Sequence, residues 1–277
     1  MRSQPKMDSS AVPTFAFGKN WKKYLSRLTP EKIELAKSAL VEFVGLDAIR
    51  GKTFIDIGCG SGVHSYAAFE LGASRVISFD HDADAVECCR TLSSRVGNPS
   101  NWTVLQGSIL DDSFVEGLGT FDLVYSWGVL HHTGEMWRAI SSAANRVGKG
   151  GLFYIAIYNR VDGPLGSNFW LRVKKTYNSS SRAGRAAMEA MFLCYYSVMN
   201  LGGRIVYHNS KKGSGPSSRG MELRTDVTDW IGGYPYEFAT AAEIKSYLQR
   251  EFSSFELVRI SETKTLGNNS FLWRRAS

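Results

Sequence analysis

A glycine-rich turn directly after a short apolar segment is the feature that most constrains how this chain folds. The segment 54–57 carries three apolar side chains and one acid, and glycine follows at positions 58, 60 and 62. Residues 63–71 continue with apolar side chains at helical spacing. Because glycine adopts such turns freely and lets a ligand approach the backbone, we expect a strand, a turn and a helix that open a nucleotide-binding sheet.

The spacing of these glycines separates two classes of nucleotide ligand. Dinucleotide-binding turns read G-x-G-x-x-G, whereas this turn reads G-x-G-x-G, and Val63 stands where the last dinucleotide glycine would be. A glycine turn by itself is also compatible with a simple tight connection. The prediction of a ligand therefore depends on the strands that follow.

Strand and helix patterns alternate from residue 52 to residue 157. The expected strands after the turn are 75–80, 121–126 and 150–157, together with a strand and its exit loop within 102–111. Helices are expected at 83–96 and 136–147. This alternation predicts an α/β fold with a parallel, doubly wound sheet. Residues 12–50 read as helical with a break at Thr29-Pro30, and a helix at 241–252 and strands at 255–260 and 270–274 close the pattern.

The same pattern divides the chain into four parts. Residues 1–50 form an N-terminal tail and helical cap, and residues 51–159 form the nucleotide-binding core. Residues 160–236 interrupt the alternation and are interpreted as an inserted lid or substrate-binding segment, with a packed helix at 182–200 and a flexible run at 210–220. Residues 237–277 return to the core.

The net charge of +7 is concentrated in the insertion, where residues 160–219 contain ten Lys and Arg against two acids. Such a cluster favours an anionic partner, which is an acidic small molecule, a nucleic acid or a membrane surface. A solvated surface without any partner is the alternative interpretation.

Other sequence features narrow the class of protein. No apolar run is long enough to span a membrane, and Met1–Ser10 lacks the apolar core of a secretory signal. The four cysteines form no C-x-x-C pair, so neither a disulfide framework nor a metal site is expected. These features favour a cytoplasmic protein.

Five parts of the chain resemble a class I S-adenosylmethionine (SAM) methyltransferase in order and spacing: 54–63, Asp80, 105–111, 121–133 and 150–157. The stretch Leu130–Thr133 is similar to that of ubiquinone-biosynthesis O-methyltransferases. The resemblance implies a Rossmann-like, seven-stranded sheet whose last strand is antiparallel. It also implies SAM as methyl donor and S-adenosylhomocysteine (SAH) as product. The Asn/Asp-Pro-Pro-Tyr signature of methyltransferases acting on adenine or glutamine amino groups is missing, because residues 126–129 occupy that place.

The resemblance implies which residues hold SAM. The acid and glycines of the turn would hold the methionine end, and Asp80 would bind the ribose, with a role as helix N-cap as its alternative. His81, Ser108 and Ile109 would border the adenine. Trp21 or Trp127 either faces the sulfonium with its ring or serves as apolar wall. The expected cofactor-binding residues are Trp21, Asp56, Gly58, Cys59, Gly60, Gly62, Asp80, His81, Ser108, Ile109, Ser126 and Trp127.

Two histidines and several aromatic residues are the candidates for catalysis and acceptor binding. His131 or His132 would be the general base, since imidazole titrates near neutral pH, and shaping the loop is the alternative role. Residues 17–21 resemble an N-terminal aromatic element that folds over the cofactor, and residues 229–237 either enter the acceptor pocket or pack on themselves. The expected acceptor contacts are Phe17, Asn20, Tyr158, Asn159, Tyr234, Tyr236 and Glu237.

The predicted function is transfer of a methyl group from SAM to oxygen or nitrogen of a small, anionic metabolite by in-line displacement. Orientation of the reactants supplies about 7–11 kcal/mol in favourable cases, and a general base adds roughly 10²–10⁴-fold. One alternative is a methyltransferase that acts on RNA or protein through the basic insertion. Another is a SAM-binding protein without catalysis.

Overall fold

The computed structural model describes residues 15, 17–206, 228 and 230–277. The elements are α1 (Gly18–Leu25), α2 (Pro30–Val44), η1 (Leu46–Ala48), β1 (Thr53–Ile57), α3 (Val63–Glu70), β2 (Arg75–Asp80), α4 (Ala83–Arg95), β3 (Trp102–Gln106), α5 (Asp112–Glu116), β4 (Phe121–Trp127), η2 (Leu130–His132), α6 (Met136–Ala144), β5 (Val147–Tyr158), α7 (Ser167–Ser179), α8 (Arg182–Val206), α10 (Ala241–Glu251), β6 (Phe255–Ser261) and β7 (Asn268–Arg275). The expected tail at 1–10 and the expected flexible run at 210–220 lie outside the described residues.

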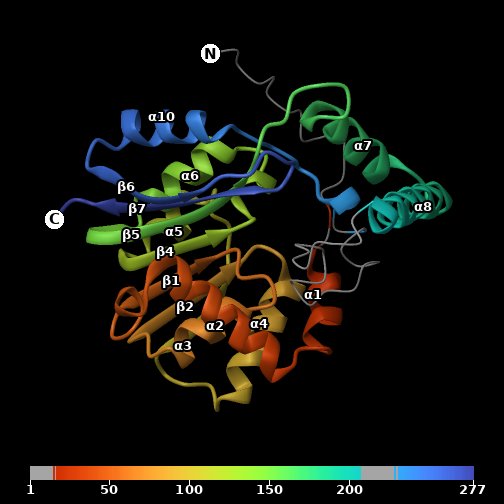
Figure 1. Cartoon of the computed structure of the whole chain (residues 1–277). Helices are drawn as coiled ribbons and strands as arrows, with labels where there is room; N and C mark the ends of the chain where they lie inside the picture. The colour runs from red at the N-terminus through yellow and green to blue at the C-terminus, as the bar shows by residue number, and fades with distance from the viewer. Residues whose placement is uncertain (1–14, 16, 207–227, 229) are drawn as a thin grey trace.

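The strands form one seven-stranded sheet in the order β3-β2-β1-β4-β5-β7-β6 (Figure 1). Strands β1 to β5 pair in parallel, and β7 pairs antiparallel with both β5 and β6. The prediction of a Rossmann-like sheet with an antiparallel last strand is confirmed. Strands β1 and β4 are neighbours, but the chain continues from β1 to β2 on one side and from β4 to β5 on the other. The loops after β1 and β4 therefore lead in opposite directions and leave a crevice at the carboxyl ends of the two strands.

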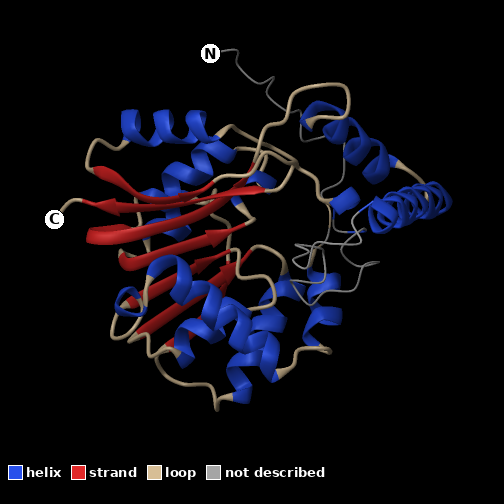
Figure 2. Cartoon of the chain, viewed as in Figure 1, coloured by secondary structure: helices blue, strands red, loops and turns tan. Residues whose placement is uncertain are grey.

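Helices cover both faces of the sheet (Figure 2). The side chains of β1 point alternately to the two faces and pack with helices on each. Phe54 packs with α2, α3 and α4 on one face, whereas Ile55 and Ile57 pack with α6 and α10 on the other. Both faces of β1 are therefore buried, which accounts for its nearly continuous apolar sequence. Helices α1, α7 and α8 lie beside the end of the sheet where the parallel strands terminate (Figure 1).

Two expected boundaries near β5 are wrong. The helix expected at 136–147 ends at Ala144, and β5 begins at Val147 rather than at residue 150. Gly150 and Gly151, the expected first residues of the strand, therefore lie further inside it, next to an irregularity in the pairing with β4. A Cβ atom on Gly151 would lie 3.0 Å from the Phe121 carbonyl oxygen, so the glycine lets the two backbones approach.

The insertion expected at 160–236 contains α7 and α8, and the helix expected at 182–200 is confirmed within α8. The chain then returns to the core through α10. Thr240 caps α10 through a capping box, in which its hydroxyl accepts from the Glu243 amide and the Glu243 carboxylate accepts from the Thr240 amide. Within the described residues, no helix combines the length and the apolar character needed to cross a membrane. The limits of the four expected parts stay predictions.

Candidate active site

A cavity of about 1150 Å³ lies at the carboxyl ends of β1, β2, β3 and β4. We distinguish two halves of its wall. The glycine half consists of the lining residues at 56–63, 79–82 and 107–110, which follow β1, β2 and β3. The aromatic half consists of Phe15, Phe17, His132, Thr133, Tyr158, Phe192, Trp230, Tyr234 and Pro235. Single small-molecule sites occupy roughly 300–1,000 Å³, so this cavity has room for two ligands side by side.

The glycine turn forms the floor of the glycine half. Gly58 and Gly60 have positive φ angles of 75° and 53°. A Cβ atom on Gly58 would lie 2.3 Å from the Val129 side chain, and one on Gly60 would lie 2.9 Å from the Trp21 ring. The turn is therefore closed to larger residues, and Trp21 of α1 covers it from above.

Asp80, at the end of β2, supports the turn from the side. One carboxylate oxygen accepts a hydrogen bond from the Gly60 amide at 3.1 Å, and the other accepts from the Asp82 amide at 3.0 Å. The N-cap of α4 is Asp82, whose carboxylate accepts from the Asp84 amide at 2.8 Å. The alternative role of Asp80 as N-cap is therefore wrong. Next to it, the largely exposed His81 has a raised pKa because of its hydrogen bond with Asp80.

Asp56 lies beneath the glycine turn and is 2% exposed. Burial, and to a smaller extent the nearby Asp80, raise the pKa of its carboxyl group to about 7. The Ser65 hydroxyl opposes this shift by donating a hydrogen bond of 2.6 Å to the carboxylate. The side chain thus lies on the cavity wall at a pKa close to neutral pH.

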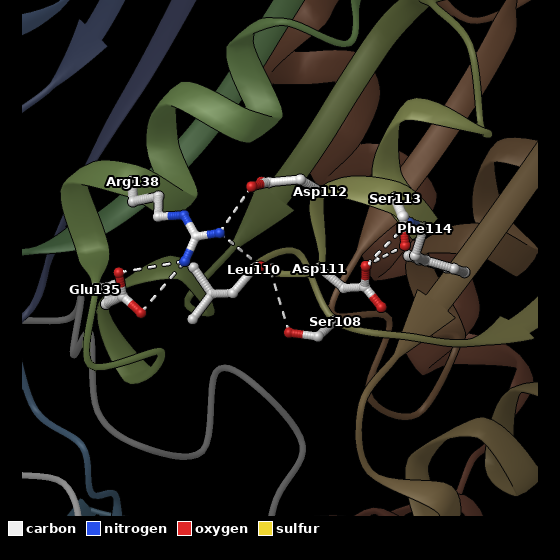
Figure 3. A network of polar contacts seen from close by, with 8 residues as sticks. All are labelled: Ser108, Leu110, Asp111, Asp112, Ser113, Phe114, Glu135 and Arg138. Atoms are coloured by element: carbon white, nitrogen blue, oxygen red, sulfur yellow. Dashed lines mark hydrogen bonds and ion pairs between the residues drawn. The ribbon is translucent and has the colours of Figure 1, made fainter.

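The loop after β3 is held in place by Arg138 of α6 (Figure 3). The guanidinium group donates to the Leu110 carbonyl at 3.0 Å and to the Asp112 carboxylate at 2.9 Å, and it pairs with Glu135 at 3.4 Å. The Ser108 hydroxyl accepts a hydrogen bond from the Leu110 amide at 3.1 Å. These contacts hold the 108–110 loop in the wall at the end of β3.

Two contacts join α1 to the start of α4 and so close the glycine half. The Gly18 amide donates to the Asp82 carboxylate at 2.9 Å. The Lys22 ammonium pairs with Asp84 at 2.6 Å. Asp82 therefore caps one helix and holds the start of another, and this places Trp21 over the turn.

Among the described residues, the aromatic half carries no Lys, Arg, Asp or Glu. The Phe17 and His132 rings lie 5.0 Å apart between centroids, and those of Tyr158 and Trp230 lie 5.6 Å apart. The buried ammonium of Lys174 supports this wall from behind, 4.4 Å from the Trp230 ring centroid, and donates to the Trp230 carbonyl. The described wall of this half is thus built mainly of aromatic side chains and suits an apolar ligand.

The two adjacent histidines have opposite tautomers. The Nδ1 atom of His132 lies 2.6 Å from the Pro235 carbonyl oxygen, which only accepts, so Nδ1 carries the proton and the lone pair is on Nε2. The Nδ1 atom of His131 accepts from the Tyr158 amide at 3.3 Å, so its proton is on Nε2. Burial lowers the pKa of His132 to about 3 and that of His131 well below its usual range, so both rings are neutral.

Fourteen of the expected residues line the cavity, and their contacts with ligands stay predictions: Phe17, Trp21, Asp56, Gly58, Cys59, Gly60, Asp80, His81, Ser108, Ile109, Trp127, His132, Tyr158 and Tyr234. The remaining seven lie outside the described lining: Asn20, Gly62, Ser126, His131, Asn159, Tyr236 and Glu237. The seven are fixed in the surrounding structure.

The contacts of these seven explain why they do not reach the cavity. Ser126 donates to the Ile57 carbonyl, and Asn159 donates to the carbonyls of Thr263 and Thr265. Glu237 accepts from the Met136 amide at 3.0 Å. The remaining four are Gly62, which precedes α3 beside Cys89, and the buried Asn20, His131 and Tyr236.

A further set of lining residues, which belongs to neither half, lies under α2 and was not predicted from the sequence. It consists of Lys32, Leu35, Ala36, Ala39 and Leu40 of α2 with His64, Tyr125, Tyr154 and Asn268. The α2 residues recur at three- and four-residue spacing, which predicts one helix face but not what that face covers. His64 directly follows the glycine turn, and its position there was the available signal. Burial lowers its pKa to about 4.

Comparison with known proteins gives a consistent picture. Residues 49–211 match a family model described as a methyltransferase domain. A ubiquinone biosynthesis O-methyltransferase from Methylobacterium sp. is 30% identical over 144 residues, which cover 49% of this chain and 55% of that protein. A ribosomal protein L11 methyltransferase from Tolumonas auensis is 49% identical over 49 residues, which cover 18% and 17%. The chain thus spans about half or less of the length of these relatives.

Solved structures show the same fold at low identity. A magnesium protoporphyrin IX methyltransferase from Synechocystis PCC 6803 with bound SAH superposes with a TM-score of 0.53 at 15% identity, and 94% of each chain is covered. An O-methyltransferase family protein from Burkholderia thailandensis has a TM-score of 0.56 at 14% identity, covering 94% of this chain and 60% of that one. At these identities the likeness extends to the fold alone.

Proposed function

The chain belongs to the methyltransferase-domain family and is a SAM-dependent methyltransferase, and on this premise we propose that it methylates a hydroxyl group of a small, planar aromatic molecule. The observation that carries the proposal is the aromatic half of the cavity, which is uncharged in its described part and contains one histidine whose lone pair is on Nε2. The similarity to ubiquinone biosynthesis O-methyltransferases supports oxygen as the accepting atom.

The glycine half contains hydrogen-bond acceptors that suit the donors of SAM. Asp56 offers a carboxylate to the ammonium group of the methionine moiety, and Asp80 offers one to the ribose hydroxyls. The loop at 108–110 borders the adenine, and the close approach permitted by Gly58 and Gly60 leaves the backbone accessible. When bound there, SAM supplies an electrophilic methyl group on a sulfonium centre, and the rings of Trp21 and Trp127 are the candidates to face that charge.

His132 handles the proton of the acceptor. Its Nε2 atom accepts a hydrogen bond from the acceptor hydroxyl, which turns an oxygen lone pair toward the methyl group. The O–C bond forms as the S–C bond breaks, and the hydroxyl proton moves to Nε2. An oxygen that has gained a methyl group while still protonated is far more acidic than a phenol. A weakly basic imidazole therefore removes the proton late in the reaction.

The anionic acceptor expected from the sequence receives no support from the described aromatic half, and Lys32 lines the cavity elsewhere, under α2. The positive charges of the insertion that have described side chains, such as Arg172 and Arg185, do not line the cavity. The wall of the aromatic half therefore favours ring stacking over charge pairing as the basis of recognition.

A second candidate function is methylation of RNA or protein. The basic residues at 160–219 and the similarity to ribosomal protein L11 methyltransferases favour it. An acceptor of this kind would dock on the outer face of the insertion and present one group to the aromatic half. The two functions differ in salt dependence, because docking through many charges weakens steeply with salt.

The test is methyl transfer from labelled SAM to paired aromatic compounds that differ only in a hydroxyl or an amine, with RNA and ribosomal protein in parallel. We expect label on the oxygen of hydroxylated rings, identified by mass spectrometry. Label on the amines, or on RNA or protein alone, would overturn the assignment of an aromatic hydroxyl acceptor.

A further inference from the structure

Four buried side chains from four different elements form a continuous chain of hydrogen bonds that ends at the cavity. The Trp102 indole N–H of β3 donates to the Ser78 hydroxyl of β2 at 2.9 Å. The Ser78 hydroxyl donates to the Ser65 hydroxyl of α3 at 2.7 Å, and Ser65 donates to the Asp56 carboxylate of β1 at 2.6 Å. All four residues are at most 5% exposed.

The chemistry of the first group fixes the direction of the whole chain. An indole N–H only donates, so the Ser78 oxygen must accept from it. Each serine hydroxyl has a single proton to donate. Ser78 therefore donates its hydrogen bond to Ser65, and Ser65 donates its own to Asp56. Asp56 is therefore an acceptor at Oδ2, and hydrogen bonds aligned in one direction strengthen one another.

The hydrogen bond from Ser65 favours the ionised form of the Asp56 carboxyl group, which the buried surroundings otherwise disfavour. The titratable groups that face Asp56 are Asp80 from β2, Cys59 from the glycine turn and Tyr125 from β4. None of the three is a cation. Donors to the carboxylate are then the means within its described surroundings of keeping the charge on Asp56.

We propose that Trp102, Ser78 and Ser65 act as a positioning relay that holds Asp56 ready to accept the ammonium group of the methionine moiety of SAM. Cofactor affinity then depends on an indole N–H in β3, two strands away from the glycine turn. The inference rests on the proposed function only in placing that ammonium group at Asp56, and it is independent of the acceptor.

Two probes separate the relay from general damage to the site. SAH keeps the α-ammonium group of SAM on its homocysteine moiety, whereas methylthioadenosine has the same nucleoside and a thioether without the amino acid. Titration calorimetry with each probe measures both affinities on the full chain. We expect Trp102→Phe to weaken SAH binding about three- to tenfold, the effect of one hydrogen bond, and to leave methylthioadenosine binding unchanged. Phenylalanine keeps a ring against Phe69, which stacks on Trp102.

A matched control is available in Trp273. Its indole is also fully buried, and its N–H has no acceptor among the described residues. Trp273→Phe therefore removes an indole N–H of the same kind outside the relay. We expect it to leave the ratio of the two affinities unchanged.

A thermodynamic cycle tests whether the members act as one unit. Ser65→Ala removes the last donor and should weaken SAH binding more than Trp102→Phe does, by about tenfold or more. In the double variant, Trp102→Phe should add little, because the relay is already cut. If Ser65→Ala does not fold, Ser78→Ala interrupts the same relay. Equal losses for both probes, or additive losses in the double variant, would overturn the proposal.

The pH dependence of SAH binding provides a further readout. Loss of a donor makes the Asp56 carboxyl group harder to ionise. When the pH is lowered, SAH binding should therefore be half lost at a higher pH in Trp102→Phe than in the unaltered protein. An unchanged midpoint would contradict the relay, and a higher one would support it.

Discussion

The two histidines at 131 and 132 differ in what their Nδ1 atoms contact, and this difference assigns their roles. The Pro235 carbonyl accepts a hydrogen bond from Nδ1 of His132, whereas the Tyr158 amide donates one to Nδ1 of His131. Only the first ring lines the described cavity wall. The choice between the two candidates depends on contacts with residues 27 and 103 positions away in the chain, which the sequence pattern alone does not provide.

Replacing His132 by alanine should lower turnover by about 10²-fold or more, because the acceptor hydroxyl loses both its orientation and its proton acceptor. SAH affinity should not change, since the ring belongs to the aromatic half. Steady-state kinetics and calorimetry on the same preparation measure the two quantities. His131→Asn is the comparison, and we expect it to reduce stability more than turnover. Equal turnover in His132→Ala and the unaltered protein would remove His132 from the mechanism.

Glu237 predicts a pH dependence of stability. Burial raises its pKa to about 7 from 4.5, so the folded protein binds a proton that the unfolded chain has already lost, and stability falls as pH rises through this range. Glu237→Gln has no such charge. Relative to the unaltered protein, its free energy of unfolding should therefore be about 2 kcal/mol larger at about pH 8 than at about pH 5, which means that the variant gains relative stability.

Urea unfolding at the two pH values measures this difference. The amide of glutamine keeps one acceptor oxygen for the Met136 amide, so the comparison between pH values, rather than either value alone, isolates the charge. A difference that does not change with pH would contradict the raised pKa.

At the scale of the elements, Asp82 joins α1 to α4. Asp82→Ala should destabilise the protein by about 1 kcal/mol through loss of the N-cap, and it should also weaken SAH binding because Trp21 is held less firmly over the glycine turn. Chemical unfolding and calorimetry test the two effects. Lys22→Ala breaks only an exposed ion pair and should change both quantities little. Unaltered SAH binding in Asp82→Ala would show that α1 does not cover the cofactor.

The sheet was predictable because its signals are local. Apolar strands such as 54–57 alternate with helices of clear period, and the glycine turn marks the first crossover. The alternative role of Asp80 as N-cap of α4 is wrong because Asp80 and Asp82 are both acids close to the start of the helix, and the choice between them depends on backbone geometry. The Asp82 carboxylate also holds Gly18, a contact between residues far apart in sequence.

The candidate site was predictable where its residues lie at the ends of regular strands and less so where they lie in irregular segments. Asp56, Asp80 and the loop at 108–110 follow strands of the expected order and line the cavity as expected. Tyr236 and Glu237 share a segment with Tyr234, but they point into packed structure instead of the cavity. In an irregular segment there is no periodicity from which the direction of a side chain can be inferred.

At the scale of the whole molecule, the net positive charge of the chain is concentrated in residues 160–219. If the acceptor is a small aromatic molecule, turnover should change little between about 50 and 200 mM salt, because recognition depends on ring stacking in the cavity. An RNA acceptor would lose affinity by orders of magnitude over the same range. Initial rates at several salt concentrations distinguish the two, and a steep decline would contradict the small aromatic acceptor.

Direct binding of SAH to the full chain and to Asp80→Ala, measured by titration calorimetry, tests the central claim that the SAM nucleoside lies in the glycine half with its ribose at Asp80. We predict that one molecule binds per chain and that the substitution largely abolishes binding, because the ribose hydroxyls lose their acceptor. Absence of binding to the unaltered protein, or equal affinity in Asp80→Ala, would contradict it.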